Sequence, residues 1–450
     1  MRRCGKARRR RNSNAISRRC NVATVDAAAA ECSKLFLSWP KPGPRWIAAL
    51  CFAPGAWLTA CSEEAPAPGA TVTDSAGVRV VVNPPADALG TVLVLAAEPE
   101  VEIGVVEGDA AYQLFQVVSA FLLPDGRLVV ANAGTFELRA YGPDGGHLVS
   151  FGTEGDGPGE FRRLAGAWPF AVGDSIAVWD SEVSRLSLFD AGGTFSRSLD
   201  LRQGTDIYRP SVRGVFEDGS FLVTGYDPDE AGASGHHRVT VRHYRLAADG
   251  QSAHSLGAFP GREYMSLSRE GMSVSMAVAF GANQESRAAG GRLLLAATED
   301  LALRWVDLDG SLAQVARQPR APLPVSEADF QRVRDRFLSS YDAPPDFRTI
   351  MENLWDAMPR KATAPAFDRV VVTDAGLVWM EAYRPRWEDE AGQDVWYVFG
   401  SDGIVIGTVR TPWDLEILSV SDRHVVGLVE DELEVERVRL YPYNWVGGGG

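Results

Sequence analysis

Cysteine is missing from most of this 450-residue chain. All five cysteines lie at or before residue 61, at Cys4, Cys20, Cys32, Cys51 and Cys61. Disulfide bonds and cysteine-ligated metals therefore cannot stabilise the body that follows. The sequence also lacks HExxH, GxSxG and Walker A patterns, the local signatures of zinc peptidases, serine hydrolases and P-loop enzymes. The sequence offers no compact catalytic motif, and we predict no bound metal.

Positive charge is scarce in the body as well. Residues 1–45 carry a net charge of +10, whereas the whole chain carries -14, so the remainder carries -24. Such an acidic body repels nucleic-acid phosphates, and we therefore expect no nucleic-acid partner. The same charge keeps a protein soluble.

Long hydrophobic runs are limited to one short stretch near the N-terminus. Residues 46–60 are apolar and follow Lys41 and Arg45. The stretch is too short for a bilayer span of about 20 residues, but it has the length of a signal-peptide core. We expect an export signal over residues 1–60, and we interpret residues 1–40 as a basic preamble from a wrongly assigned start codon.

The end of this stretch, Leu58-Thr59-Ala60-Cys61, resembles the bacterial lipoprotein signal, or lipobox. This resemblance implies cleavage before Cys61 and a lipid on its thiol. We expect residues 61–74 to be a lipid-anchored tether, because they begin with the flexible composition SEEAPAPGA. The implied location is the bacterial cell envelope, at the outer membrane or the periplasmic face, with membrane contact through the anchor.

The body, residues 75–444, repeats one unit. Residues 128–147 (LVVANAGTFELRAYGPDGGH) align with residues 176–195 (IAVWDSEVSRLSLFDAGGTF) at a constant offset of 48, so that Asn132 pairs with Asp180. A period of this length is typical of one β-propeller blade. Six hairpins recur in coarser form, with turns at 125–126, 173–174, 218–219, 290–291, 375–376 and 421–422. Five are followed by a second hairpin, with turns at 144–145, 192–193, 249–250, 309–310 and 402–403.

This pattern predicts an all-β fold, a six-bladed β-propeller with four-stranded antiparallel blades. The sixth unit stops one strand early, so an N-terminal strand must close the ring. Residues 99–104 are one candidate, and residues 78–83 (VRVVVN) are another. After residue 444 we expect only a flexible tail over residues 445–450.

A helical insert is expected at 322–360. Ser326 and Asp329 resemble a capping box, and apolar residues then follow at helical spacing. We expect these apolar stripes to pack against the protein's own domain.

The segment GTEGDGPGEF (152–161) resembles the loop that opens NHL-type repeats, and VWDSEVSRLSLFDAGGTF (178–195) resembles the rest of such a repeat. The whole body resembles an uncharacterised family of bacterial six-bladed propeller lipoproteins with a late helical insert. The resemblance implies an architecture and no particular chemistry.

Several motifs invite a chemical interpretation. Gly155, Gly157 and Gly159 have the wrong spacing for a phosphate loop, and we expect an interblade turn. His236, His237 and His243 lack a ligand partner at motif spacing, and we expect an exposed loop. Residues 307–310 (DLDG) contain a fragment of a calcium loop, but they lie where every blade has its outer turn.

Arg384, Arg386 and Trp387 occupy a long hairpin of blade five and are our candidates for partner binding, because Arg and Trp are favoured at binding hot spots.

Two functions remain open. The first is an envelope binding or scaffolding module for a protein, glycan or small ligand, without a cofactor. The second is a metal-dependent hydrolase, lactonase or lyase whose divalent metal lies in the central channel. An inert structural subunit is a third interpretation.

Overall fold

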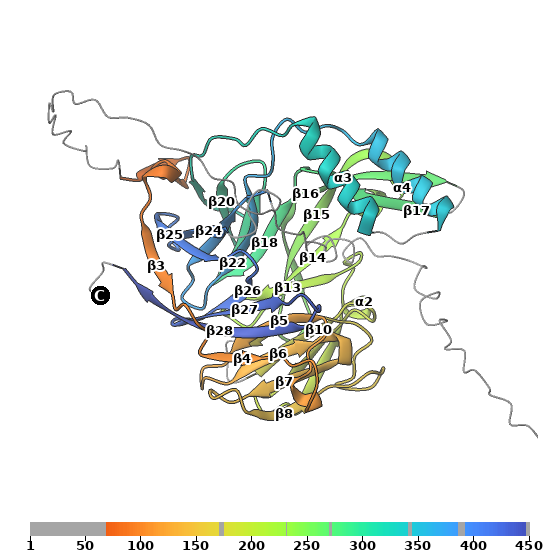
Figure 1. Ribbon diagram of the computed structural model, residues 1–450, viewed down its shortest axis with the longest axis vertical. Helices are drawn as coiled ribbons and strands as arrows, with labels where there is room; N and C mark the ends of the chain where they lie inside the picture. Colours follow the sequence, from red (N-terminus) through yellow and green to blue (C-terminus); the bar gives the residue numbers. More distant parts are fainter. Residues whose placement is uncertain are drawn as a thin grey trace, which may run out of the picture.

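The computed structural model describes residues 69–170, 175–230, 232–269, 272–340, 344–385 and 392–446. Most of these residues lie in strands, and the helices α3 (Glu327–Ser340) and α4 (Pro345–Ala357) lie together at one edge of the molecule (Figure 1). Cys61, Arg386 and Trp387 fall outside the described residues. Within these ranges, no helix is long and apolar enough to cross a membrane.

The strands pair into antiparallel groups of four, which we number as units in chain order. Unit 1 is β5 (Val117–Leu122), β6 (Leu128–Asn132), β7 (Glu137–Tyr141) and β8 (His147–Phe151). Unit 2 is β9 (Leu164–Phe170), β10 (Ser175–Asp180), β11 (Arg185–Phe189) and β12 (Phe195–Asp200). Unit 3 is β13 (Ser211–Val215), β14 (Phe221–Tyr226), β15 (Gly235–Leu246) and β16 (Ala253–Arg269), extended by β17 (Met272–Ala277).

The remaining strands form three further groups. Unit 4 is β18 (Gln284–Ala289), β19 (Arg292–Ala297), β20 (Ala302–Asp307) and β21 (Leu312–Arg317). Unit 5 is β22 (Phe367–Val372), β23 (Val378–Ala382), β24 (Gln393–Phe399) and β25 (Val405–Pro412). Unit 6 is β26 (Glu416–Val420), β27 (His424–Glu430), β28 (Glu436–Trp445) and β4 (Val101–Ile103). Units 5 and 6 are joined into one nine-stranded sheet by β3 (Thr91–Leu95).

The first strands of the units surround a common axis. β5 contacts β9 and β26, β13 contacts β9 and β18, and β22 contacts β18 and β26. The labels of β5, β13, β18, β22 and β26 lie around the centre of the view in Figure 1. Sheets arranged around an axis in this way make the fold a β-propeller, as predicted. The apolar core lies between neighbouring sheets, and Trp179, Trp305, Trp379 and Trp396 are fully buried there.

An N-terminal strand completes unit 6, as predicted. β4 pairs antiparallel with β28, and Ile103 lies opposite Val438. Both side chains are buried in one apolar cluster with Val130 of unit 1, so this strand also packs the last unit against the first. The joint removes an open sheet edge where the two ends of the chain meet.

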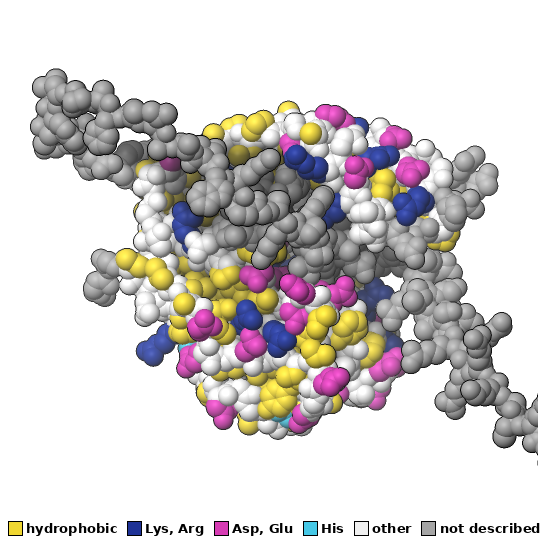
Figure 2. All heavy atoms as spheres, in the orientation of Figure 1, with side chains coloured by type: hydrophobic (Ala, Val, Ile, Leu, Met, Phe, Trp, Pro, Cys, Tyr) yellow, Lys and Arg dark blue, Asp and Glu magenta, His cyan; other side chains and the backbone are white. Residues whose placement is uncertain are grey.

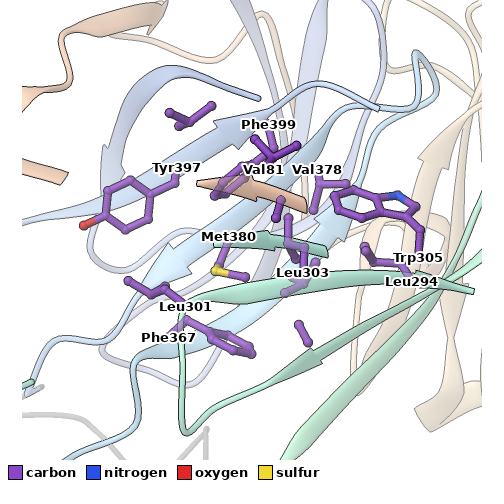
Figure 3. Packing of buried hydrophobic residues seen from close by; sticks show 14 residues of the cluster. Val81, Leu294, Leu301, Leu303, Trp305, Phe367, Val378, Met380, Tyr397 and Phe399 are labelled. Carbon is purple, nitrogen blue, oxygen red and sulfur yellow. The ribbon is translucent and has the colours of Figure 1, made fainter. Parts of the chain in front are cut away.

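The second closing candidate was wrong. Residues 78–83 contain β2 (Val78–Val82), which pairs in parallel with β21 at the outer edge of unit 4. Its side chain Val81 is buried among Leu303 of unit 4 and Val378 and Phe399 of unit 5 (Figure 3). A run of β-branched residues fits any apolar sheet edge, so its sequence alone did not identify its partner.

Both predicted ends of the body need correction. Residues 71–74, assigned to the tether, lie in β1 (Thr71–Ser75), which pairs with β2 through a turn whose Ala76 and Gly77 both have positive φ. That geometry is the two-residue hairpin turn favoured by strand twist. At the other end, β28 continues through Trp445, which pairs with Leu93 of β3. Trp445 is therefore part of the sheet and not of a tail.

The helical insert is confirmed. The Ser326 hydroxyl accepts from the Asp329 amide (3.2 Å), and the Asp329 carboxylate accepts from the Ser326 amide (2.9 Å), which is the reciprocal pattern of a capping box. Trp355 and Phe330 pack edge to face, with ring centroids 5.3 Å apart. Together with Met276 of β17 they form one buried cluster, so the helices cover the extension of unit 3.

Candidate functional site

One face of the propeller carries nearly all the additions to the basic repeat. In an antiparallel unit, the loop between strands two and three emerges at the same end as the connection to the next unit. The helical insert (322–360), the extension of unit 3 through β17 and the loop between β23 and β24 all belong to these two classes. We call this end the insertion face. The short hairpin turns lie at the opposite end.

The inner strands have bulges near the insertion face. The ladder between first and second strands shifts register at Val117/Ser119, Val212/Gly214, Phe367/Val370 and Ile417/Ser419. At each shift, residues of the inner strand fall outside the regular register of the ladder, among them Val118, Arg213, Arg369 and Leu418. A bulge redirects a side chain out of the regular alternation of the strand.

Two groups of ion-paired residues lie on the inner strands of units 4, 5 and 6 and on β23, which holds Glu381. The Arg369 side chain lies 3.0 Å from the Glu381 carboxylate and 3.3 Å from that of Glu416. In the neighbouring unit 4, the Arg287 guanidinium lies 2.8 Å from the Glu285 carboxylate, and both residues are on β18. We call these five residues the axial cluster. The Glu381 side chain is only 3% exposed, whereas that of Glu416 is 40% exposed.

The electrostatics around Arg369 favour its charged form. Burial disfavours the charged form of Arg369, but the carboxylates of Glu381 and Glu416 outweigh this penalty and raise the pKa of the guanidinium above its usual value. A guanidinium between these carboxylates already supplies the positive charge that a metal ion would bring. Among the described residues, no group of three His, Cys, Asp or Glu side chains is placed to hold a metal.

Buried polar side chains shape the loops of this face. Asn132, fully buried, accepts from the Phe115 amide (2.7 Å), and Asp180 accepts from the Arg162 amide (2.7 Å). These two residues are equivalent in the sequence repeat. In both units, the side chain at the end of the second strand therefore binds the loop that leads into the first strand of the same unit. Their role is to order loops through charge-assisted or neutral hydrogen bonds.

The arginine predicted for partner binding is placed at the base of its loop. The guanidinium of Arg384 donates to the Asp394 carboxylate at 3.0 Å. Asp394 is buried, at 3% exposed, so the pair fastens the two ends of the segment that connects β23 to β24. Arg386 and Trp387 lie between these ends, outside the described residues, and their assignment stays a prediction.

The histidines do not lie in an exposed loop, and that prediction was wrong. β15 begins at Gly235, so His236, His237 and His243 are all strand residues, and His243 is only 1% exposed. The cause is the length of the β15–β16 hairpin, which extends well beyond the other units. Desolvation lowers the pKa of His243 to about 4, and the nearby Arg213 charge acts in the same direction.

The other two motifs are turns, as predicted. The Gly157 amide donates to the Glu160 carboxylate (2.8 Å), and Gly159 has a φ of +76°, which an L-residue rarely adopts. In the DLDG segment, Asp309 accepts from the Ser311 amide (2.8 Å), which closes an outer hairpin turn.

A surface feature of the insertion face escaped the sequence analysis. Five large apolar side chains are exposed where units 6 and 1 meet, on the loops of this face and on the adjoining end of β5: Val105, Val106, Phe115, Val118 and Leu433. We call them the apolar loop patch. Their loops meet around Glu436, whose carboxylate accepts from the Val117 amide (2.7 Å). Gly104 lies against the backbone of the same residue. Leu433 is 74% exposed, the largest value among these five.

The sequence matches no protein-family model and no curated protein. Solved structures with a similar arrangement include a putative exported protein from Bacteroides fragilis, at 12% identity and a TM-score of 0.45, covering 79% of this chain and 95% of that one. A member of the DUF4221 family from Bacteroides vulgatus has 11% identity and a TM-score of 0.47, covering 79% and 99%. Virginiamycin B lyase from Staphylococcus aureus has 10% identity and a TM-score of 0.38, covering 78% and 99%. Similarity at this level carries no argument about ligand or activity.

We predict that Arg369→Met lowers the free energy of unfolding by about 2 kcal/mol or more, because it leaves the buried Glu381 carboxylate without this guanidinium. Denaturant titration measures the loss. Arg369→Met/Glu381→Leu should regain part of it, and Glu416→Gln, at the exposed side of the cluster, should cost less than about 1 kcal/mol. If Arg369→Met is as stable as Glu416→Gln, the Arg369–Glu381 pair does not have the importance assigned to it here.

We also predict a histidine-dependent loss of stability in mild acid. His243 has a folded pKa of about 4, below its unfolded value of 6.5. Between these pH values the unfolded chain gains a proton that the folded chain does not, so stability falls as pH drops from about 6.5 to about 4. The full effect is on the order of 3 kcal/mol. His243→Leu should flatten this slope in denaturant titrations, and His254→Gln, at an exposed position, should leave it unchanged.

Proposed function

We propose that this protein is an exported, lipid-anchored propeller that binds a partner at its insertion face. The apolar loop patch carries the proposal. Leu433, Val106 and Phe115 are all more than half exposed on one set of neighbouring loops. Large apolar side chains that gather on one surface are typical of recognition sites. Arg384 lies at the base of the β23–β24 connection on the same face, and the proposal includes Arg386 and Trp387, which follow it in the sequence.

The partner class is an envelope protein or glycan. Exposed apolar side chains with polar residues around them are the arrangement of a recognition surface. The lipobox at residues 58–61 supports export and anchoring through Cys61, and the NHL-like repeats of units 1 and 2 belong to the same proposal. The activity as proposed uses no cofactor and no nucleic acid.

The metal-dependent alternative has no specific observation in its favour. It needs carboxylate or amide oxygens from several inner strands that converge on one ion. Two of the inner-strand carboxylates, Glu285 and Glu416, instead lie against arginine side chains. We therefore propose binding and not hydrolysis as the function.

Site-specific photocrosslinking tests the binding surface. A photoreactive residue at Leu433 or Phe115, in cells expressing the full-length protein, should give the same crosslinked partner from both positions. The matched control is Leu148 on β8, which is 56% exposed but outside the insertion face. Leu433→Asp should reduce the yield from Phe115 by about tenfold or more, as for the loss of a binding hot spot. Equal adducts from all three positions, or none, would contradict the proposal.

A further inference from the structure

The first described segment of the chain, residues 71–103, wraps the outside of three units. β1 and β2 lie at the outer edge of unit 4, β3 pairs with β25 of unit 5 and β28 of unit 6, and β4 completes unit 6. We call this segment the belt. It follows the outer rim of the propeller and not its faces, and it is drawn in orange in Figure 1.

Exposed apolar side chains gather along the belt, between exposed carboxylates such as Asp74 and Glu98. The described part of the chain has fourteen exposed large hydrophobic residues, and six belong to the belt or to the strand ends beside it: Val72, Val82, Val94, Ile406, Trp445 and Val446. We call these six the rim patch. Figure 2 shows hydrophobic side chains next to the C-terminal end of the chain, where β3 and β28 pair. None of the six belongs to the apolar loop patch, so the rim is a second surface.

Contacts connect the rim patch across units 4, 5 and 6. Asn83, which follows Val82, donates to the Gly403 carbonyl (3.0 Å) and accepts from the Val405 amide (2.8 Å). Ile406 is next in β25, and it precedes Gly407, which lies against Val92 of β3. The Val446 amide donates to the Val92 carbonyl (2.8 Å), which brings the end of β28 to the same place.

The belt is also the part of the body nearest in sequence to the proposed anchor. Thr71 follows Cys61 by ten residues, which reach at most about 35 Å when fully extended. A lipid on Cys61 therefore keeps the rim of unit 4 within about 35 Å of the bilayer. An apolar surface this close to a bilayer gains free energy by entering its interface, and Trp is enriched at that depth.

We infer that the rim patch rests on the membrane that holds the anchor. The propeller then stands on its rim, with its axis parallel to the bilayer, and the insertion face opens sideways along the membrane surface. The occupant of the rim is lipid, in particular the zwitterionic interface, because the body of the protein carries a charge of -24 and is repelled by anionic lipid. This inference rests on the proposed anchoring through Cys61.

The test uses the full-length protein, processed and lipidated in its host and reconstituted in phosphatidylcholine vesicles. Because the chain after Cys61 lacks cysteine, Val94→Cys provides a single site for a fluorescent label. The matched control is Ser196→Cys on β12 of unit 2, an exposed position on the part of the ring opposite unit 5. Quenching by spin-labelled lipid should be at least threefold stronger for the Val94 label than for the Ser196 label.

Vesicle flotation separates the two levels of failure. Protein that does not float, or Cys61→Ser protein that floats equally well, overturns the anchor and not the rim contact. Protein that floats while lipid quenches both labels equally overturns the rim contact and leaves the anchor intact. If the Val94 label is shielded from an aqueous quencher without lipid quenching, and the shielding rises with protein concentration, the rim is covered by a second copy and the inference is wrong.

Discussion

The antiparallel pairing of β4 with β28 is the constraint on which the rest of the structure depends. A propeller is held together by apolar contacts between neighbouring sheets, and each sheet needs a neighbour on both sides. Unit 6 takes three strands from the end of the chain and its fourth from the beginning. Ile103 and Val438 thereby complete a cluster that includes Val130 of unit 1. Loss of this pairing would open the ring at the joint and expose the side chains of two units.

Ring closure also explains why the belt exists. A chain that must bring residue 101 to unit 6 can follow the outside of units 4 and 5 first, and it gains burial on the way. Val81 enters the core between units 4 and 5, and Leu93 is buried between units 5 and 6. The segment that connects the proposed lipid to the propeller therefore also fastens three units together. Insertions, in contrast, accumulate on the face where loops are free to lengthen without disturbing sheet pairing.

The hairpin turns and their spacing predicted the strand order, the helical insert and the closing strand, because turn residues and apolar alternation are local signals. The partner of residues 78–83 was missed because a run of β-branched residues favours a strand without specifying which strand it pairs with. The buried position of His243 was missed because the strand that holds it is set by pairing with β16, and the local sequence does not identify that partner. The axial cluster was invisible to motif analysis because Glu285, Arg369 and Glu416 lie far apart in the chain and meet only in the folded ring.

Native-state hydrogen exchange of the β4 and β28 amides tests the central claim most directly. If the N-terminal strand closes the ring, the β4 amides exchange only through global unfolding, with the same free energy as the amides of β6 in unit 1. The account predicts that the exchange free energies of the β4 and β6 amides converge as the denaturant concentration rises. If β4 exchanges several kcal/mol more easily than β6, as an edge strand that frays would, the ring does not depend on that strand and the account is contradicted.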